Sequence, residues 1–561
     1  MPSIVAKNAD LQALLGKDLS YDELEGLLTL VKGELKRRDS NETDLKIELN
    51  DTNRPDTWTV EGIARQLRYH LGFEQPDYNF FAKTGKYEVI AKKDIAAIRP
   101  AIGAFVVRNI NITEEVLEQI IQTQEKLCEN FGSKRRSVAI GVYNLDAITF
   151  PVYYRSEAPE GFKFIALGDE EPKTLGQILV EHQKGKQYAH LVNKFPRYPL
   201  LIDAQDNVLS FPPIINSRLV GEVKTDSTNL FIEATGDDLE KITLALNILA
   251  YNLTDRGGEI LPVTVRYEEK LNGHSQLTFP LALNNSAIVE HDLFEKMLGV
   301  KLAAEDVVAK LKQYGCIVSV EQGKYNVATL SYRNDYLHPV DVVEDYFMSC
   351  GYDNVGAASP SCFTVGKLHQ VTEFTDKARN ILVGCGFEEV FSSVLMSKEA
   401  FGVKSLISEP LVEIDNVMTE TCGVVRNSLL PCLFGVEATS AKALYPHKMF
   451  EVGDVAIVNP REVQGSSTDI LCAFAIAHAK AGFSEIHSIL DVLTYYLGAE
   501  TRLEHKESKT FISGRSASIF VGEVEIGVLG EVHPEVLTNW DLKVPVVACE
   551  INISRLNTIS V

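Results

Sequence analysis

The sequence predicts a multidomain α+β protein. The chain has 561 residues, of which 45% are hydrophobic and 24% are charged. This length allows about three or four domains, each with its own core. A helix–strand–helix pattern near the N-terminus recurs after a long middle segment. That segment mixes strand-like and helical patterns, and the last third alternates helices with strands.

Composition restricts the location of the protein. No apolar run approaches the roughly 20 residues that cross a bilayer. The opening MPSIVAKNADLQALLG lacks the pattern of a secretory signal or a transit peptide. The nine cysteines are scattered and form no C-x-x-C pair, which predicts reduced, buried thiols and no disulfide framework or zinc site. We therefore expect a soluble, cytoplasmic protein.

The charge balance restricts the possible partners. Lys and Arg total 55 against 77 Asp and Glu, a formal net charge of −22. So acidic a chain is not expected to hold nucleic acid over its whole surface, so any such contact requires a local basic patch or a more basic partner. The few basic stretches, at 132–137 (GSKRRS) and 256–270, are interpreted as solvated surface.

The N-terminal segment predicts two helical stretches around a strand. Ser20 and Glu23 form a capping box, and leucines at helical spacing follow. The alternating LKIELN, residues 45–50, predicts a strand. Apolar residues in 60–71 recur at helical spacing, and Gly72 ends that helix.

Residues 293–352 repeat this layout. In an alignment without a gap, Arg54 and Asp56 correspond to Arg333 and Asp335. We interpret this as one helix–strand–helix module used twice, in domains 1–85 and 272–355. So short a match also arises by chance.

Two further domains are expected. Residues 90–265 contain strand-like runs such as AIGAFVVRNI and TNLFIEATG, separated by helical patterns, which predicts a mixed sheet. Residues 360–561 alternate helices and strands, and a hairpin signal at Gly522 predicts an antiparallel sheet.

The last helix of the second module begins among carboxylates. Pro339 suits the first helical position, so the helix should start near His338, with a buried stripe of Val340, Val343 and Phe347. The carboxylates are Asp335, Asp341, Glu344 and Asp345.

Two interpretations of these carboxylates stay open. Clustered carboxylates suit Mg²⁺ or Ca²⁺, whereas acidic residues in a first helical turn also complement the helix dipole. The first module carries Gly62, Arg65 and Gln66 opposite the last three carboxylates, so the fold itself does not require these charges.

Several stretches in chain order resemble the β subunit of phenylalanyl-tRNA synthetase, of the archaeal and eukaryotic cytosolic type. They are NRPDTWTVEGIARQLR, FPPIIN, NLFIEATG, YRNDYLHPVDVVEDYFMSCGYDN, RNSLLP, MFEVGDV and GVLGEVHPEVL. The resemblance implies a heterotetramer of two α and two β chains that joins phenylalanine to its tRNA. ATP and phenylalanine would bind on the α subunit, with Mg²⁺ as cofactor.

The resemblance also assigns roles to the domains. The segment 360–561 is similar to a class II synthetase catalytic domain but lacks the ATP-binding arginine pattern, so it should pack against the α subunit. The implied magnesium ligands are Asp335, Asp341, Glu344 and Asp345.

The middle domain would hydrolyse tyrosine wrongly attached to the tRNA. A pocket shaped for phenylalanine rejects an added hydroxyl by only on the order of 10². Glu233 shares a strand face with Phe231 and would accept a hydrogen bond from the tyrosyl hydroxyl. The resemblance adds Leu201 as a wall and Ser210 to position water or substrate. It also assigns the shape of the cleft to Pro212, Pro213 and Asn216.

Other interpretations compete with editing. Glu233 would otherwise be a solvated residue at a strand end and Ser210 a turn residue, and no Ser–His–Asp or Cys–His triad is apparent. The chain would then be a structural, tRNA-docking subunit with an inactive editing pocket. A nucleic-acid-binding protein built on the repeated modules is a third possibility, which the net charge of −22 disfavours.

Overall fold

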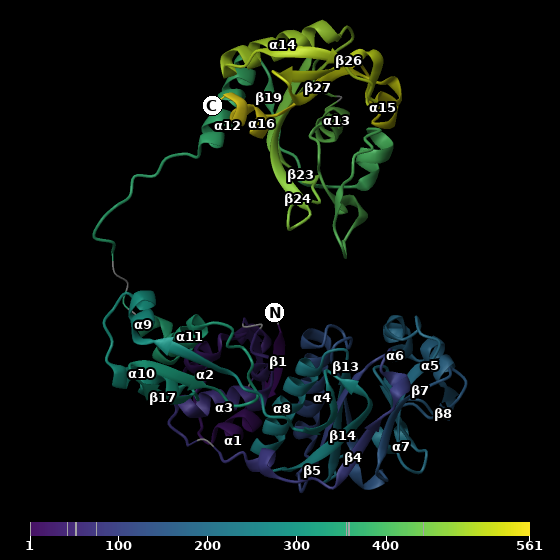
Figure 1. The fold of residues 1–561 in the computed structure, drawn as a ribbon, viewed down its shortest axis with the longest axis vertical. Helices are drawn as coiled ribbons and strands as arrows, with labels where there is room; N and C mark the ends of the chain where they lie inside the picture. The colour runs from purple at the N-terminus through teal and green to yellow at the C-terminus, as the bar shows by residue number, and fades with distance from the viewer. Residues whose placement is uncertain are drawn as a thin grey trace. The chain divides into compact units, whose positions relative to one another are not determined.

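The computed structural model describes residues 2–41, 43–50, 53–74, 76–354, 356, 359–440 and 442–560. The chain divides into two compact units, Met1–Ser359 and Pro360–Val561 (Figure 1). Both units combine helices with sheets, so the predicted α+β multidomain class is confirmed. The predicted boundaries at Val355 and Val561 lie outside the described residues.

The N-terminal part of the first unit is a three-stranded sheet with three helices. Its strands pair in the order β1-β3-β2. Its elements are β1 Ser3–Lys7, α1 Asn8–Leu15, α2 Tyr21–Leu28, β2 Gly33–Leu35, β3 Asp44–Leu49 and α3 Val60–His70. The predicted capping box of Ser20 and Glu23 begins α2.

The last part of the first unit has the same order of elements and the corresponding strand order β16-β18-β17. Its elements are β16 Ser286–Glu290, α9 His291–Leu298, α10 Ala304–Gln313, β17 Ile317–Glu321, β18 Lys324–Ala328 and α11 Pro339–Cys350. Each module thus has three strands, whereas the sequence pattern indicated one. The additional strands are short, and β17 is mostly exposed, so they lack a clear alternation of apolar and polar residues.

Helix α11 starts at Pro339 with His338 as its N-cap, as predicted. Its buried face differs from the predicted stripe. Val343 is buried as expected, but Val342 and Tyr346 are buried with it, while Val340 and Phe347 are only half-buried. The buried face includes other residues than predicted because it packs on β16 and α10 of its own module.

A ten-stranded sheet lies between the two modules in sequence. It is mixed, since β4 runs parallel to β7 and to β14 while its other pairs are antiparallel. Helix α8, Leu239–Asp255, packs on β5 and β13, and α4, Glu114–Lys126, adds Val116 and Ile120 to the same core. The strands are β4 Tyr87–Ala91, β5 Ala101–Arg108, β6 Ala139–Asn144, β7 Val152–Glu157, β10 Tyr198–Ile202, β11 Val208–Phe211, β12 Ile215–Asn216, β13 Leu230–Gly236, β14 Glu259–Leu271 and β15 His274–Phe279.

Short elements with a small core of their own lie beside the β10–β12 end of this sheet. They are β8 Lys163–Phe164, β9 Lys173–Thr174, α5 Leu175–Glu181 and α6 Gln183–Tyr188, while α7 Arg218–Gly221 packs on β6 and β11 of the large sheet.

The second unit is built on a seven-stranded sheet with the order β19-β23-β24-β28-β27-β26-β25. All its pairs are antiparallel except β19 with β23, and the predicted hairpin at Gly522 joins β26 to β27. Helices cover both faces. The strands are β19 Glu388–Glu389, β23 His447–Val458, β24 Ser466–Ala477, β25 Thr501–His505, β26 Phe511–Val521, β27 Val524–Val532 and β28 Val546–Asn552. On one face lie α12 Gln370–Gly384, α14 Phe483–Leu497 and α16 Ile553–Ser560, and on the other α13 Leu430–Thr439 and α15 Pro534–Asn539.

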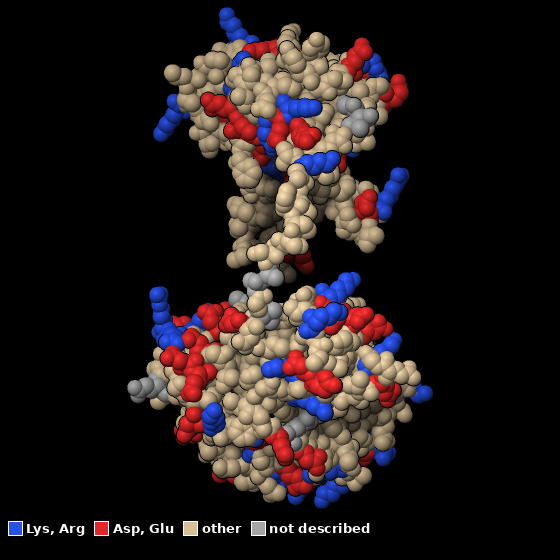
Figure 2. Space-filling view, turned by 90° about the vertical axis from the view of Figure 1, so that its left-hand side faces the viewer, with Lys and Arg blue, Asp and Glu red and all other residues tan. Residues whose placement is uncertain are grey.

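Three general properties follow from the fold. All nine cysteines are free, and five are buried as expected, whereas Cys350, Cys385 and Cys422 are half-buried and Cys362 is exposed. Within the described part of the chain, no helix is long and apolar enough to cross a membrane. On the face that Figure 2 shows, Lys and Arg lie among Asp and Glu in both units, without a continuous basic surface among the coloured residues.

Candidate functional site

A cavity of about 290 Å³ opens beside the large sheet. Its wall is largely apolar, and residues of β6, β11, β13 and α4 contribute to it. The polar side chains in the lining include Ser210, Asn216, Glu233 and Thr235. A mostly apolar hollow with several polar side chains is typical of small-molecule sites, and this volume suits one amino-acid group.

Glu233 is the buried acid of this cavity. It lies in β13, is only 3% exposed, and accepts a hydrogen bond through Oε1 from the Tyr143 hydroxyl at 2.9 Å. Its Oε2 has no hydrogen-bond partner among the described residues. Burial raises the pKa of Glu233 to about 7, although Tyr143 and Arg99 act to lower it. The alternative of a solvated residue at a strand end is therefore wrong.

Ser210 lies close to the same groups, although its strand β11 is not a neighbour of β6 or β13 in the sheet. The Tyr143 hydroxyl is 2.8 Å from Ser210 Oγ, so Tyr143 connects Ser210 with Glu233. Ser210 lies in β11 and is 2% exposed, and it is a strand residue and not a turn residue. The structure therefore brings together two of the three predicted residues around a tyrosine that the sequence interpretation missed.

Leu201 differs from its predicted role as a wall. It pairs with Ser210 across β10 and β11, but it has no exposed surface and belongs to the hydrophobic core of the sheet. It is not part of the cavity lining, whereas Pro212, Pro213 and Asn216 are. Leu201 supports the strand that carries Ser210, since its side chain packs within the core.

Two arginines hold the backbone around the cavity. Arg135 donates from Nη1 to the carbonyl oxygens of Pro213 and Ile214, at 3.2 and 3.0 Å. Arg99 is buried and donates from Nη1 to the carbonyl oxygen of Arg136 at 2.7 Å and from Nε to Thr235 Oγ1 at 3.0 Å. The interpretation of 132–137 as a solvated run is therefore wrong for Arg135, which folds back onto the rim of the cavity.

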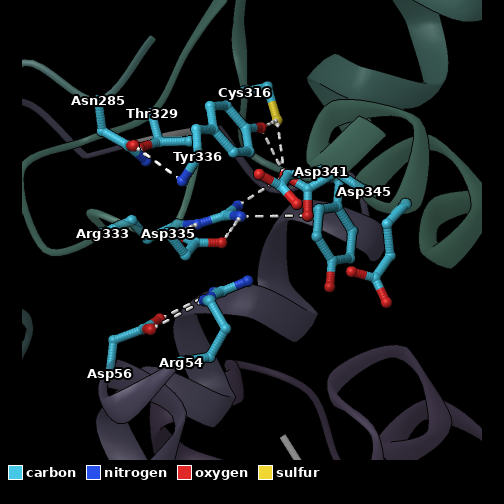
Figure 3. A network of polar contacts seen from close by, with 12 residues as sticks. Arg54, Asp56, Asn285, Cys316, Thr329, Arg333, Asp335, Tyr336, Asp341 and Asp345 are labelled. Carbon is cyan, nitrogen blue, oxygen red and sulfur yellow. Dashed lines mark hydrogen bonds and ion pairs between the residues drawn. The ribbon is translucent and has the colours of Figure 1, made fainter. Parts of the chain in front are cut away.

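The carboxylates of the second module form a different arrangement, centred on Arg333 (Figure 3). Arg333 is 3% exposed and binds Asp335 through Nε at 2.9 Å and Nη2 at 2.6 Å. Its Nη1 lies 2.9 Å from Asp345 Oδ2, which also accepts from the Tyr336 hydroxyl at 2.5 Å. Burial opposes ionisation of Asp335, but Arg333 outweighs burial and lowers its pKa to about 2.

The remaining two carboxylates have other partners. Asp341 Oδ2 accepts the backbone N–H groups of Leu337 and His338, each at 2.7 Å, and so caps α11. Glu344 Oε1 lies 2.7 Å from Lys32 Nζ of the first module. In the described residues no group of three or more His, Cys, Asp or Glu is arranged to hold a metal ion. The four predicted ligands therefore do not fit one magnesium ion in this arrangement, because Arg333, Lys32 and backbone N–H groups already bind them.

The first module repeats the arginine arrangement. Arg54 binds Asp56 through Nε at 2.9 Å and Nη2 at 2.8 Å, and Nη2 donates to Gln66 at 3.1 Å. Gln66 is the counterpart of Asp345, and both contact the arginine of their own module. Figure 3 shows the Arg54–Asp56 pair beside the Arg333–Asp335 pair. This shared geometry indicates a structural role for the repeated Arg-x-Asp pattern.

Comparisons with known proteins identify the family. Residues 288–352 match the tRNA synthetase B5 domain, and residues 357–553 match the phenylalanyl tRNA synthetase beta chain CLM domain. The phenylalanine–tRNA ligase beta subunit of Borreliella burgdorferi (strain ZS7) is 37% identical, over 99% of this chain and 99% of that protein. The one from Borrelia hermsii is 36% identical, over 99% of this chain and 100% of that protein. This chain belongs to the phenylalanine–tRNA ligase beta subunit family.

A solved structure of the family covers the first unit. It is an N-terminal fragment of the phenylalanyl-tRNA synthetase beta subunit from Pyrococcus horikoshii, 37% identical with a TM-score of 0.59. The match covers 63% of this chain and 100% of that fragment. The narrower prediction of an archaeal and eukaryotic cytosolic type is not supported, because the Borreliella and Borrelia beta subunits are bacterial.

Three residues around Glu233 of this beta subunit were missed from the sequence. Tyr143 lies in AIGVYN and Arg99 in a loop, and neither pattern indicates which side chain it meets. Gly141 lies opposite Glu233 in the register of β6 and β13. A Cβ there would lie 2.1 Å from the Tyr143 hydroxyl oxygen and 2.6 Å from Glu233 Oε1. The only available signal was the spacing of Gly141 and Tyr143, which places both on one strand face.

Proposed function

We propose that the chain acts as the beta subunit of a phenylalanine–tRNA ligase and removes tyrosine wrongly joined to tRNA(Phe). The observation that carries the editing proposal is the free Oε2 of buried Glu233 in a cavity of about 290 Å³. Family membership supports the first part, since the Borreliella and Borrelia relatives both bear that name. ATP-dependent charging would take place on the alpha subunit, with which this chain assembles as a proposed α2β2 heterotetramer.

Selection in the cavity follows from hydrogen bonding. A tyrosyl side chain has a phenolic O–H that can donate a hydrogen bond to Glu233 Oε2. This hydrogen bond is strong when the carboxylate is ionised. A phenylalanyl side chain would leave the buried carboxylate desolvated without a partner, which disfavours its binding. The site would therefore hold the tyrosyl group and release the phenylalanyl group, the reverse of a pocket shaped for phenylalanine.

The proposed reaction is ester hydrolysis. Water adds to the carbonyl carbon of the tyrosyl ester, the bond from that carbon to the ribose oxygen breaks, and free tyrosine and tRNA leave. In this reaction Ser210 would position the water or the substrate. Because no nucleophilic triad was apparent in the sequence, acceleration would come from positioning and from the hydroxyl groups of the tRNA.

The domains would divide the work as follows. Residues 90–265 would edit, the modules within 1–85 and 272–355 would support that domain, and residues 360–561 would pack against the alpha subunit. Phe391, Met418 and Leu444 of the second unit are almost fully exposed, which supports a partner that covers them. Magnesium enters this proposal only as the ion that accompanies ATP. Cytoplasmic location stays a prediction.

The test is hydrolysis of Tyr-tRNA(Phe) by the assembled ligase. Glu233→Gln and Glu233→Ala should each reduce the rate of clearance by about tenfold or more, since they remove a charged acceptor, and should leave phenylalanine charging unchanged. Glu550→Gln is the matched control, because Glu550 is a carboxyl of the second unit whose pKa burial also raises to about 7. Unchanged clearance by both Glu233 variants would remove Glu233 from this role, whereas no clearance by the unaltered ligase would favour the purely structural subunit.

A further inference from the structure

We infer that Tyr143 is a positioning residue of the proposed editing site, where it binds one oxygen of Glu233 and leaves the other to the substrate's phenol. This inference rests on the proposed function. Tyr143 has no exposed surface and is not part of the cavity lining, so it would act through Glu233 and not on the substrate. Its hydroxyl contacts both polar residues predicted for the reaction, at 2.9 Å to Glu233 and 2.8 Å to Ser210.

The direction of these hydrogen bonds follows from the chemistry of the groups. An ionised Glu233 accepts only, so the Tyr143 hydroxyl donates its proton to Oε1. The Tyr143 oxygen is then free to accept from the Ser210 hydroxyl. Burial and the neighbouring carboxylate keep the pKa of Tyr143 well above its usual value, so the phenol remains a donor. Ser210, Tyr143 and Glu233 therefore form one directed chain.

The fixed chain determines how the carboxylate faces the cavity. Oε1 already accepts from the phenol of Tyr143, which favours Oε2 for a second phenol, that of the substrate. That oxygen is buried and lacks a partner among the described residues. Without Tyr143 the carboxylate would be free to rotate and to use either oxygen. Tyr143 thus presents one acceptor in one orientation, which lowers the entropy lost when the substrate binds.

The strands are built to accept this contact. Tyr143 and Gly141 lie on the same face of β6, and Gly141 pairs with Glu233 of β13. A side chain at 141 would overlap the Tyr143 hydroxyl and Glu233 Oε1, at 2.1 and 2.6 Å from its Cβ. The ring of Tyr143 lies 5.9 Å from that of Phe231, which holds it from the side. A tyrosine needed only for packing would not require a residue without a side chain, Gly141, next to its hydroxyl.

Charged and titratable neighbours of Glu233 set its response to pH. Arg99 and Tyr143 act to lower the pKa of Glu233, and burial raises it to about 7. Tyr154 also interacts with it electrostatically, and the pKa of Tyr154 lies well above the ordinary tyrosine value because of burial. Loss of the Tyr143 donor would destabilise the ionised carboxylate, so the pKa of Glu233 would rise further.

The experiment is a Tyr143→Phe substitution in the assembled ligase. We expect kcat/KM for Tyr-tRNA(Phe) hydrolysis to fall about 10- to 100-fold, mostly through a higher KM, because capture of the phenol weakens. The activity of the unaltered enzyme should increase as the pH rises through about 7, where Glu233 ionises. In the variant this increase should occur at higher pH, after correction for spontaneous ester hydrolysis. Phenylalanine charging should not change.

The matched control is Tyr267→Phe. Tyr267 is a buried tyrosine of the same sheet whose hydroxyl donates to the backbone carbonyl of Ile102, away from Glu233. It should lose no editing activity and show no shift in the pH profile. An equal loss in both variants, or a loss in Tyr143→Phe without a pH shift, would reduce Tyr143 to a packing residue and overturn the inference.

The outcomes also separate this inference from the proposed function. If the enzyme with the unaltered chain does not clear Tyr-tRNA(Phe), the proposed function is rejected and the inference with it. If that enzyme clears the tRNA and Glu233→Gln does not, while Tyr143→Phe matches the unaltered enzyme in rate and pH profile, only the inference fails.

Discussion

At the residue scale, Arg333 compensates the charge of the clustered carboxylates, a role that the sequence interpretation assigned to a metal cation. Its guanidinium contacts Asp335 and Asp345, and all three side chains are less than a tenth exposed. A buried charge is costly unless a partner compensates it, so each member depends on the others. The pKa of Asp335, lowered to about 2, means that its contribution to stability is present above its unfolded value of 3.8. That contribution is lost as the pH falls through about 2.

Replacement of Arg333 tests this interpretation. Arg333→Met should destabilise the second module by about 3–5 kcal/mol, because two buried carboxylates lose their counter-charge. Native-state hydrogen exchange of the α11 amides measures the change. Lys543→Met is the control, since its ion pair with Asp541 is exposed and contributes only about 0–1 kcal/mol to its own unit. If the α11 amides of Arg333→Met stay protected from hydrogen exchange, and only when Mg²⁺ is present, the cation interpretation would be restored.

At the scale of elements, the two modules differ at the start of their last helix. The first module has a closely packed glycine there, and the second has a carboxylate. Gly62 in α3 stands opposite Asp341 of α11, and a Cβ at 62 would lie 1.8 Å from the Asp56 carbonyl oxygen. The start of α3 therefore packs directly on the preceding turn. The start of α11 instead has a carboxylate that caps it. The same fold thus uses two different ways of beginning the same helix.

Two glycine substitutions in one module should have opposite effects. Gly62→Ala should destabilise the first module by about 1–3 kcal/mol, because the backbone must move to accommodate the new methyl group. Gly26 in α2 has nothing within 4 Å of an added Cβ, so Gly26→Ala should stabilise the module by about 0.4–1 kcal/mol. Hydrogen-exchange protection of the β3 amides reports both changes. A stabilising Gly62→Ala would contradict the close packing of this turn.

At the scale of the whole molecule, the chain has two units with separate cores. The large sheet and both modules belong to Met1–Ser359, and the seven-stranded sheet belongs to Pro360–Val561. Each has its own layers of helix and sheet, which is the condition for independent folding. The crystal structure of the Pyrococcus beta subunit contains only an N-terminal fragment, whose full length matches 63% of this chain. An N-terminal part of a family member is therefore ordered by itself.

We therefore expect residues 1–359 and 360–561 to fold as separate fragments. Each should show a cooperative thermal transition, because its core is complete within the fragment. The second fragment should bind a hydrophobic dye more strongly than the first, since Phe391, Met418 and Leu444 lack a cover in it. Calorimetry and dye fluorescence measure these properties. A fragment that unfolds without cooperativity would show that the units depend on each other.

Local patterns predicted the elements well where the determining contacts lie close in sequence. The Ser20–Glu23 capping box, the helix start at Pro339 and the hairpin at Gly522 each depend on residues within about four positions. Short exposed strands such as β17 were missed, since they carry no alternation.

The sequence by itself determined the α+β class, most long helices and strands, and the family, because periodicity, caps and motifs are local properties. Only the tertiary structure decided how the site residues pair. Tyr143 meets Glu233 across 90 positions, and Lys32 meets Glu344 across 312. Such contacts depend on strand register and on the packing of whole modules, which no local pattern records.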